Sequence, residues 1–119
     1  MSDSSVIDPK AHDRLLEWGG PKLLRQMLRL FLENSGERMD QIAQGLEEGT
    51  VTFVELGAHS LKSSAANVGA TTVSELAARM EKLALREDLE GARQLHEGLV
   101  TSLAAAEERL RELEKRLEG

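Results

Sequence analysis

One histidine in this chain, His59, is followed three and four positions later by Lys62 and Ser63. A neutral imidazole is a nucleophile near pH 7 and can take up a phosphoryl group on a ring nitrogen. That group adds negative charge, which a lysine one helical turn away offsets and a serine hydroxyl can hydrogen-bond. We therefore interpret these residues as a site for covalent phosphoryl transfer through His59. A surface histidine without a role is the alternative that the spacing alone leaves open.

The helix that must carry His59 is predicted to open at a capping box formed by Thr52 and Glu55 and to close at Gly69. Its apolar positions are spaced four, three, four and three apart: Val54, Ala58, Leu61, Ala65 and Val68. At roughly 100° per residue they fall in one arc about 80° wide. A second arc, centred about 130° away, holds His59, Lys62, Ser63 and Ala66. We expect His59 to project away from the core, with Ser63, Ala66 and Gly69 as the open surface near it.

Two helices are predicted before this one. Asp8-Pro9 is typical of a helix start, so a short helix is expected over residues 9–18, stopped by Gly19-Gly20. A long helix then runs from Pro21 to Gly49, because its apolar residues keep a spacing of three and four throughout. Its middle, at residues 34–36, is expected to be weak and kinked.

Two further helices are predicted after it. A second capping box, Thr72 to Glu75, opens one of them, and Asp88 caps the last. No segment alternates with a period of two, so the chain is predicted to be all-α. The expected architecture is an antiparallel up-down four-helix bundle with a short extra N-terminal helix across one end. The last helix is expected to outrun the bundle as a solvated tip or, alternatively, a coiled-coil handle.

The composition excludes several classes of function. The 119 residues suffice for one domain, predicted over residues 8–119 after a flexible N-terminal lead-in over residues 1–7. A net charge of −6 and only 3% aromatic residues argue against binding nucleic acid. There is no cysteine, hence neither a disulfide nor a thiolate metal site. With no secretory signal and no membrane-spanning apolar run, a cytoplasmic protein is expected.

The remaining histidines are assigned no chemistry. His12 is expected on the surface, and His96 as a partly buried packing residue of the last helix. No metal site is predicted, because no histidines four apart accompany a glutamate. No glycine-rich phosphate loop is present, so we expect no cofactor and no kinase activity of its own. The chain is predicted to be a phosphotransfer carrier rather than a stand-alone enzyme.

The segment AHSLKSSAANVGA, residues 58–70, resembles the signature of histidine-containing phosphotransfer (HPt) domains. That signature runs His, any residue, Leu, Lys and then small residues, and it ends in Gly-Ala. The matching positions are His59, Leu61, Lys62, Ser64, Asn67, Gly69 and Ala70. The flanks LRLFLE and RMEKLALREDLEGA are also similar to the family, so the resemblance covers nearly the whole chain. Ser63 departs from it, because Gly is common there, and so does Ala65, where Ser is frequent.

The resemblance implies an intermediate of a phosphorelay. The histidine at the position of His59 accepts a phosphoryl group from a receiver-domain aspartyl-phosphate, or from a histidine kinase system, and passes it to another receiver. Lys62 is implied to steady that group, and Glu81 is a candidate for the polar residue that faces the histidine from the next helix. The expected partners are receiver domains of response regulators or hybrid histidine kinases, and Mg²⁺ is expected on the receiver.

Two other functions remain open. The chain could be a scaffold that docks a receiver without phosphotransfer, or a helical adaptor that oligomerises through its last helix, although a monomer is expected. The small residues from Ser63 to Ala66 suit either helix packing or docking. Four further apolar residues are interpreted as core or, alternatively, as an exposed patch around His59: Leu16, Leu23, Leu30 and Ala66.

Overall fold

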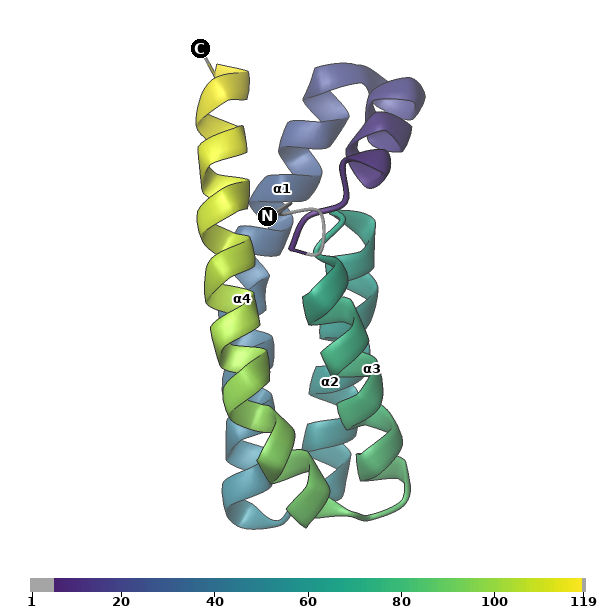
Figure 1. Ribbon diagram of the computed structural model, residues 1–119, viewed down its shortest axis with the longest axis vertical. Coiled ribbons are helices and arrows are strands. Elements are labelled where there is room, and N and C mark those ends of the chain that lie inside the picture. The colour runs from purple at the N-terminus through teal and green to yellow at the C-terminus, as the bar shows by residue number, and fades with distance from the viewer. Residues whose placement is uncertain (1–5, 119) are drawn as a thin grey trace.

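The computed structural model describes residues 6–118. They form four α-helices: α1 (Pro9–Glu48), α2 (Val51–Asn67), α3 (Thr71–Leu85) and α4 (Leu89–Glu118). Consecutive helices are antiparallel, and α1 and α3 each pack against both α2 and α4 (Figure 1). No strand occurs in the described part of the chain, so the predicted all-α four-helix bundle is confirmed. No helix within residues 6–118 is long and apolar enough to cross a membrane.

The first helix, α1, is interrupted near its start. Gly20 has a φ of 70° and a ψ of −169°, which lie outside the helical region, and Pro21 begins the next turn. The predicted short N-terminal helix is therefore confirmed as the first part of α1. It folds back over the end of the α2–α3 pair (Figure 1). The helices α1 and α4 extend beyond that end. This short segment consequently covers the end of the helix that carries His59.

The long part of α1 is regular where a kink was expected. Gly20 is the residue with non-helical dihedral angles inside α1, and residues 34–36 are helical. Ser35 is buried, and its hydroxyl donates a hydrogen bond to Glu107 Oε2 of α4 at 2.6 Å. The kink prediction is wrong because this polar residue is satisfied by the neighbouring helix and does not disturb the backbone ladder.

The core confirms the predicted apolar faces. Every apolar position predicted for the His59 helix is buried: Val54, Ala58, Leu61, Ala65 and Val68. The facing helix α3 also buries small residues, Ala77 and Ala84, which allow a close approach of the two helices. Removing these side chains from water contributes on the order of 25 cal/mol per Å² of apolar surface. The packing therefore holds α2 rigidly while the opposite face of the helix stays free.

The ends of the helices differ from the predicted caps in two places. Helix α2 begins at Val51 and α3 at Thr71, and in neither case does the preceding residue make a side-chain capping bond. Both predicted capping boxes are therefore wrong, because their threonines already lie inside the first turn. Two predicted helix ends are confirmed. Asp88 caps α4 by accepting a hydrogen bond from the Gly91 N–H at 2.9 Å, and Gly49 ends α1.

The two ends of the chain pack more closely than expected. Val6 and Ile7 lie against the core, although a flexible lead-in was predicted to extend to residue 7; residues 1–5 are outside the described part. At the other end, Leu113 and Leu117 of α4 pack against the core. Arg29 of α1 pairs there with Glu114 at 3.3 Å and with Glu118 at 3.5 Å. The end of α4 is thus docked on α1, neither a solvated tip nor a free coiled-coil handle.

Candidate functional site

His59, Lys62 and Glu81 form one hydrogen-bonded cluster between α2 and α3. Glu81 Oε2 lies 2.6 Å from His59 Nδ1, and Glu81 Oε1 accepts a hydrogen bond from Lys62 Nζ, also at 2.6 Å. The His59 side chain is 58% exposed, whereas that of Glu81 is 14% exposed. The predicted projection of His59 into solvent is confirmed. Glu81, a candidate from the family resemblance, is in direct contact with the two residues that the sequence spacing singled out.

The carboxylate of Glu81 determines which ring nitrogen of His59 is free. The pKa of Glu81 lies below its ordinary value of 4.5, chiefly because Lys62 hydrogen-bonds the carboxylate; burial acts in the opposite direction, and His59 lowers the pKa further. An ionised carboxylate can only accept a hydrogen bond, so the proton of the neutral imidazole resides on Nδ1. The lone pair then lies on Nε2, the nitrogen that a second molecule can approach.

The stability of the cluster is expected to depend on pH. A carboxyl whose pKa is lowered by folding stabilises the folded state above its unfolded-state pKa, and this contribution is lost as the pH falls through the lowered value. For Glu81 the loss begins near 4.5. Urea unfolding of the wild type and Glu81→Gln should therefore give a larger difference in free energy at about pH 6 than at about pH 3. A difference that is independent of pH would contradict the ion pairing of Glu81.

The turn between α2 and α3 sets the register in which these residues meet. Gly69 has a φ of 78°, a left-handed conformation that favours glycine, and its carbonyl accepts a hydrogen bond from the Asp8 N–H at 2.7 Å. Further along, the hydroxyl of Ser74 on α3 donates to the carbonyl of Lys62 at 3.0 Å. These bonds prevent α3 from sliding along α2, and thereby keep Glu81 opposite His59.

The predicted open surface is only partly present. Ser63 and Ala66 are exposed on the same side of α2 as His59, but Gly69 is buried. A Cβ atom at Gly69 would lie 2.5 Å from the Asp8 carbonyl oxygen. The assignment of Gly69 to the open surface is therefore wrong: the N-terminal segment covers it, and its role is to allow that close approach.

The other two histidines lie away from the cluster. His12 is buried, and its Nε2 donates a hydrogen bond to the carbonyl of Val68 at 2.7 Å, so the prediction of a surface residue is wrong. The bond ties the short N-terminal helix to the end of α2, a contact across 56 positions that local spacing does not reveal. His96 is half-buried on α4, as predicted. Within residues 6–118, no three His, Cys, Asp or Glu side chains group as metal ligands.

The apolar residues that were considered as a possible patch divide between surface and interior. Leu16, Leu30 and Ala66 are exposed, whereas Leu23 is half-buried against the core. Leu30 also lines a groove of ≈ 230 Å³ between α1 and α2, whose α2 wall includes Ser60 and Ser64. The interpretation as core is therefore confirmed for Leu23, whereas an apolar patch around His59 stays a prediction.

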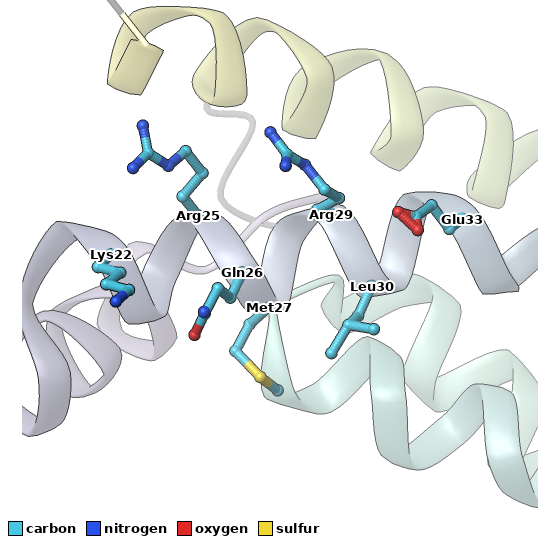
Figure 2. A pocket seen from close by; sticks show the side chains of 7 residues that line it. All are labelled: Lys22, Arg25, Gln26, Met27, Arg29, Leu30 and Glu33. Carbon is cyan, nitrogen blue, oxygen red and sulfur yellow. The ribbon is translucent and has the colours of Figure 1, made fainter.

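A second groove, of ≈ 500 Å³, lies along α1 and is lined by three positively charged side chains, Lys22, Arg25 and Arg29 (Figure 2). Arg25 and Arg29 extend from α1 toward α4, while Met27 and Leu30 extend from the opposite side of the helix toward α2 (Figure 2). Arg29 is already paired with two glutamates of α4. Because the side chains diverge, the groove does not gather donors around one ligand, and it is separate from the His59 cluster.

The comparisons with known proteins agree with this geometry. The family model of the Hpt domain matches residues 26–118. In the solved structures, the chain is similar to histidine-containing phosphotransfer protein B (HptB) from Pseudomonas aeruginosa PAO1, with a TM-score of 0.87 at 23% identity. The match covers 93% of this chain and 96% of that one. No curated protein sequence matches the chain.

An exposed imidazole held by a carboxylate on a four-helix bundle, together with the family match, defines the class of protein. The chain belongs to the Hpt domain family. It is a histidine phosphotransfer intermediate of a phosphorelay, and proteins of this family interact with receiver domains.

Proposed function

We propose that Nε2 of His59 is the atom that carries the phosphoryl group. Its lone pair forms the N–P bond while the P–O bond to the aspartate of a receiver breaks, and the aspartate leaves as a carboxylate. The proton on Nδ1 stays on the ring, hydrogen-bonded to Glu81. A second receiver then takes the group by the reverse displacement and restores neutral His59. The observation that carries this assignment is the Nδ1···Glu81 contact at 2.6 Å beneath an exposed ring.

Lys62 is proposed to steady the transferred group. Its ammonium is one helical turn from His59 and is held by Glu81, so a modest change of side-chain torsions lets it reach an anion on Nε2. Ser63 and Ala66 are proposed to be the small residues over which the partner approaches. The catalytic Mg²⁺ of the exchange is proposed to belong to the receiver.

A transfer assay tests the assignment. A receiver domain whose aspartate carries a labelled phosphoryl group is incubated with the full chain. The two proteins are then separated, and the label transferred to the chain is measured. Phosphohistidine is labile in acid and stable in base, which distinguishes it from a phosphoserine ester. We expect acid-labile label that a second, uncharged receiver removes. Binding of the receiver without label would favour the non-catalytic scaffold instead.

Replacing Lys62 with Ala is expected to slow phosphoryl transfer on the order of tenfold, the effect of losing one charge-assisted hydrogen bond of ~1.5 kcal/mol. The fold should persist, because Lys62 lies outside the buried face of α2. The initial rate of label transfer from a charged receiver measures the effect, with Lys82→Ala on the exposed face of α3 as the matched control. A wild-type rate for Lys62→Ala would make Lys62 a surface residue only.

We further propose that the chain acts as a monomer in the cytoplasm. The docking of the end of α4 onto α1 supports the monomer, because it occupies the leucines that a coiled coil would use. The absence of cysteine suits a reducing compartment. Sedimentation at several concentrations tests the first statement, since an oligomeric adaptor would show a concentration-dependent mass.

A further inference from the structure

Two large leucines are exposed on the helices that form the His59 cluster. Leu56 of α2 is 50% exposed and Leu85 of α3 is 60% exposed. The other exposed large hydrophobic residue of these helices, Phe53, places its Cβ beside Gly45 of α1. Around His59 on α2, by contrast, the exposed side chains are small, at Ser63 and Ala66.

Both leucines lie on one side of the cluster. Leu56 precedes His59 by three residues, and Leu85 follows Glu81 by four residues. Since α2 and α3 are antiparallel and His59 contacts Glu81, both leucines are displaced in the same direction, away from the turn at Gly69. At about 1.5 Å per residue the displacement is roughly 5 Å, one helical turn. At a helical step of roughly 100°, both also lie within about 60° of the neighbouring cluster residue.

The chemistry at His59 dictates what covers these leucines. In-line transfer brings the phosphorus atom on the donor's aspartate to roughly 3 Å from the acceptor nitrogen, so the donor protein must lie directly on this face. A specific protein interface buries about 800 Å² on each partner, a disc of roughly 16 Å radius. A disc of that size centred on His59 includes side chains one helical turn away.

We propose that Leu56 and Leu85 form the apolar anchor on which the receiver docks, a proposal that rests on phosphotransfer through His59. Apolar side chains next to the receiver's aspartate cover the two leucines, while Ser63 and Ala66 leave space for the loops that carry the aspartate. A few residues near the centre of an interface supply most of its binding energy, and an apolar side chain contributes there in proportion to the area that it buries. The leucines thus select receivers that present an apolar surface on one side of the aspartate.

The experiment compares Leu56→Gln, Leu85→Gln and the double variant with the wild type in transfer from a charged receiver domain. We expect KM for the receiver to rise on the order of tenfold for each single variant, with kcat nearly unchanged. Val100→Gln is the matched control, since Val100 is 44% exposed on α4, which is not among the principal packing partners of α2. Circular dichroism should show the same fold for all variants, because the leucines are exposed.

A small donor separates this proposal from the proposed function. Phosphoramidate is a small donor that needs no docking surface, so it should label His59 equally in the wild type and in all three leucine variants. Wild-type KM values in the leucine variants would overturn the anchor while leaving His59 as the acceptor. Variants that alter only self-association, with unchanged transfer, would also overturn it. A wild-type chain that takes no label on His59 from either donor would overturn the proposed function, and the anchor with it.

Discussion

Replacing His59 with Gln is expected to reduce phosphoryl labelling to background while the fold is retained. The side chain is 58% exposed, so its loss should change the free energy of unfolding by no more than about 0.5 kcal/mol. Glutamine can still donate a hydrogen bond to Glu81 through its amide, but an amide nitrogen has no lone pair available for attack on phosphorus. The loss of labelling is measured as acid-labile label after incubation with a phosphorylated receiver. A thermal unfolding curve shows whether the fold is retained.

The half-buried histidine of α4, His96, provides the control for this experiment. His96 lies on α4, away from the His59 cluster, so His96→Gln should label like the wild type. Label that persists in His59→Gln and disappears in His96→Gln would move the phosphoacceptor to α4. Loss of label in both variants, with the fold intact, would mean that the experiment does not identify which of the two histidines accepts the phosphoryl group.

The second large effect is expected at Glu81. In Glu81→Ala the ring of His59 loses the carboxylate that keeps the proton on Nδ1, and Lys62 loses its partner. A hydrogen bond to a charged group contributes about 1.5–3 kcal/mol, so the rate of transfer should fall about 10- to 100-fold. On this proposal Glu81 is a positioning residue that acts through His59, because Oε2 contacts Nδ1 and not Nε2, the proposed attacking nitrogen.

The amide variant distinguishes positioning from bulk. In Glu81→Gln the amide oxygen can still accept a hydrogen bond from the Nδ1–H of His59, so this variant should retain more activity than Glu81→Ala. Initial rates of transfer from a phosphorylated receiver, measured for both variants and the wild type, test this. Equal rates for the wild type, Glu81→Gln and Glu81→Ala would show that Glu81 only fills space.

The exposed position of His59 could be predicted from the sequence because it depends on one helix. A period of 3.6 residues assigns each position of α2 to a face, and five apolar residues define the buried one. His59 lies opposite that face whatever packs against it. The same argument correctly predicts the breaks at Gly20 and Gly49, since these residues change the local backbone. By contrast, the predicted capping boxes failed, because Thr52 and Thr72 compete with neighbouring residues for the helix start.

The neighbours of His59 were decided by the tertiary structure. Glu81 meets it across 22 positions, and His12 meets Val68 across 56. Helical periodicity shows which face a residue occupies, but the residue opposite it depends on how far one helix is shifted along the next. That shift is set here by the turn at Gly69, where the backbone of Asp8 packs too closely for a side chain. The sequence alone therefore determined an exposed histidine on a helix, and packing decided that a carboxylate lies beside it.

The proposed transfer through His59 depends on an exposed imidazole whose Nδ1 is engaged by a carboxylate and whose Nε2 is left free. Identifying another side chain as the carrier of the phosphoryl group would remove the basis for every site assignment. Helical periodicity can predict that the His59 ring is exposed, since exposure depends on the face of one helix. The contact between Nδ1 and Glu81 requires α2 and α3 to pack in one register, which only the folded chain provides.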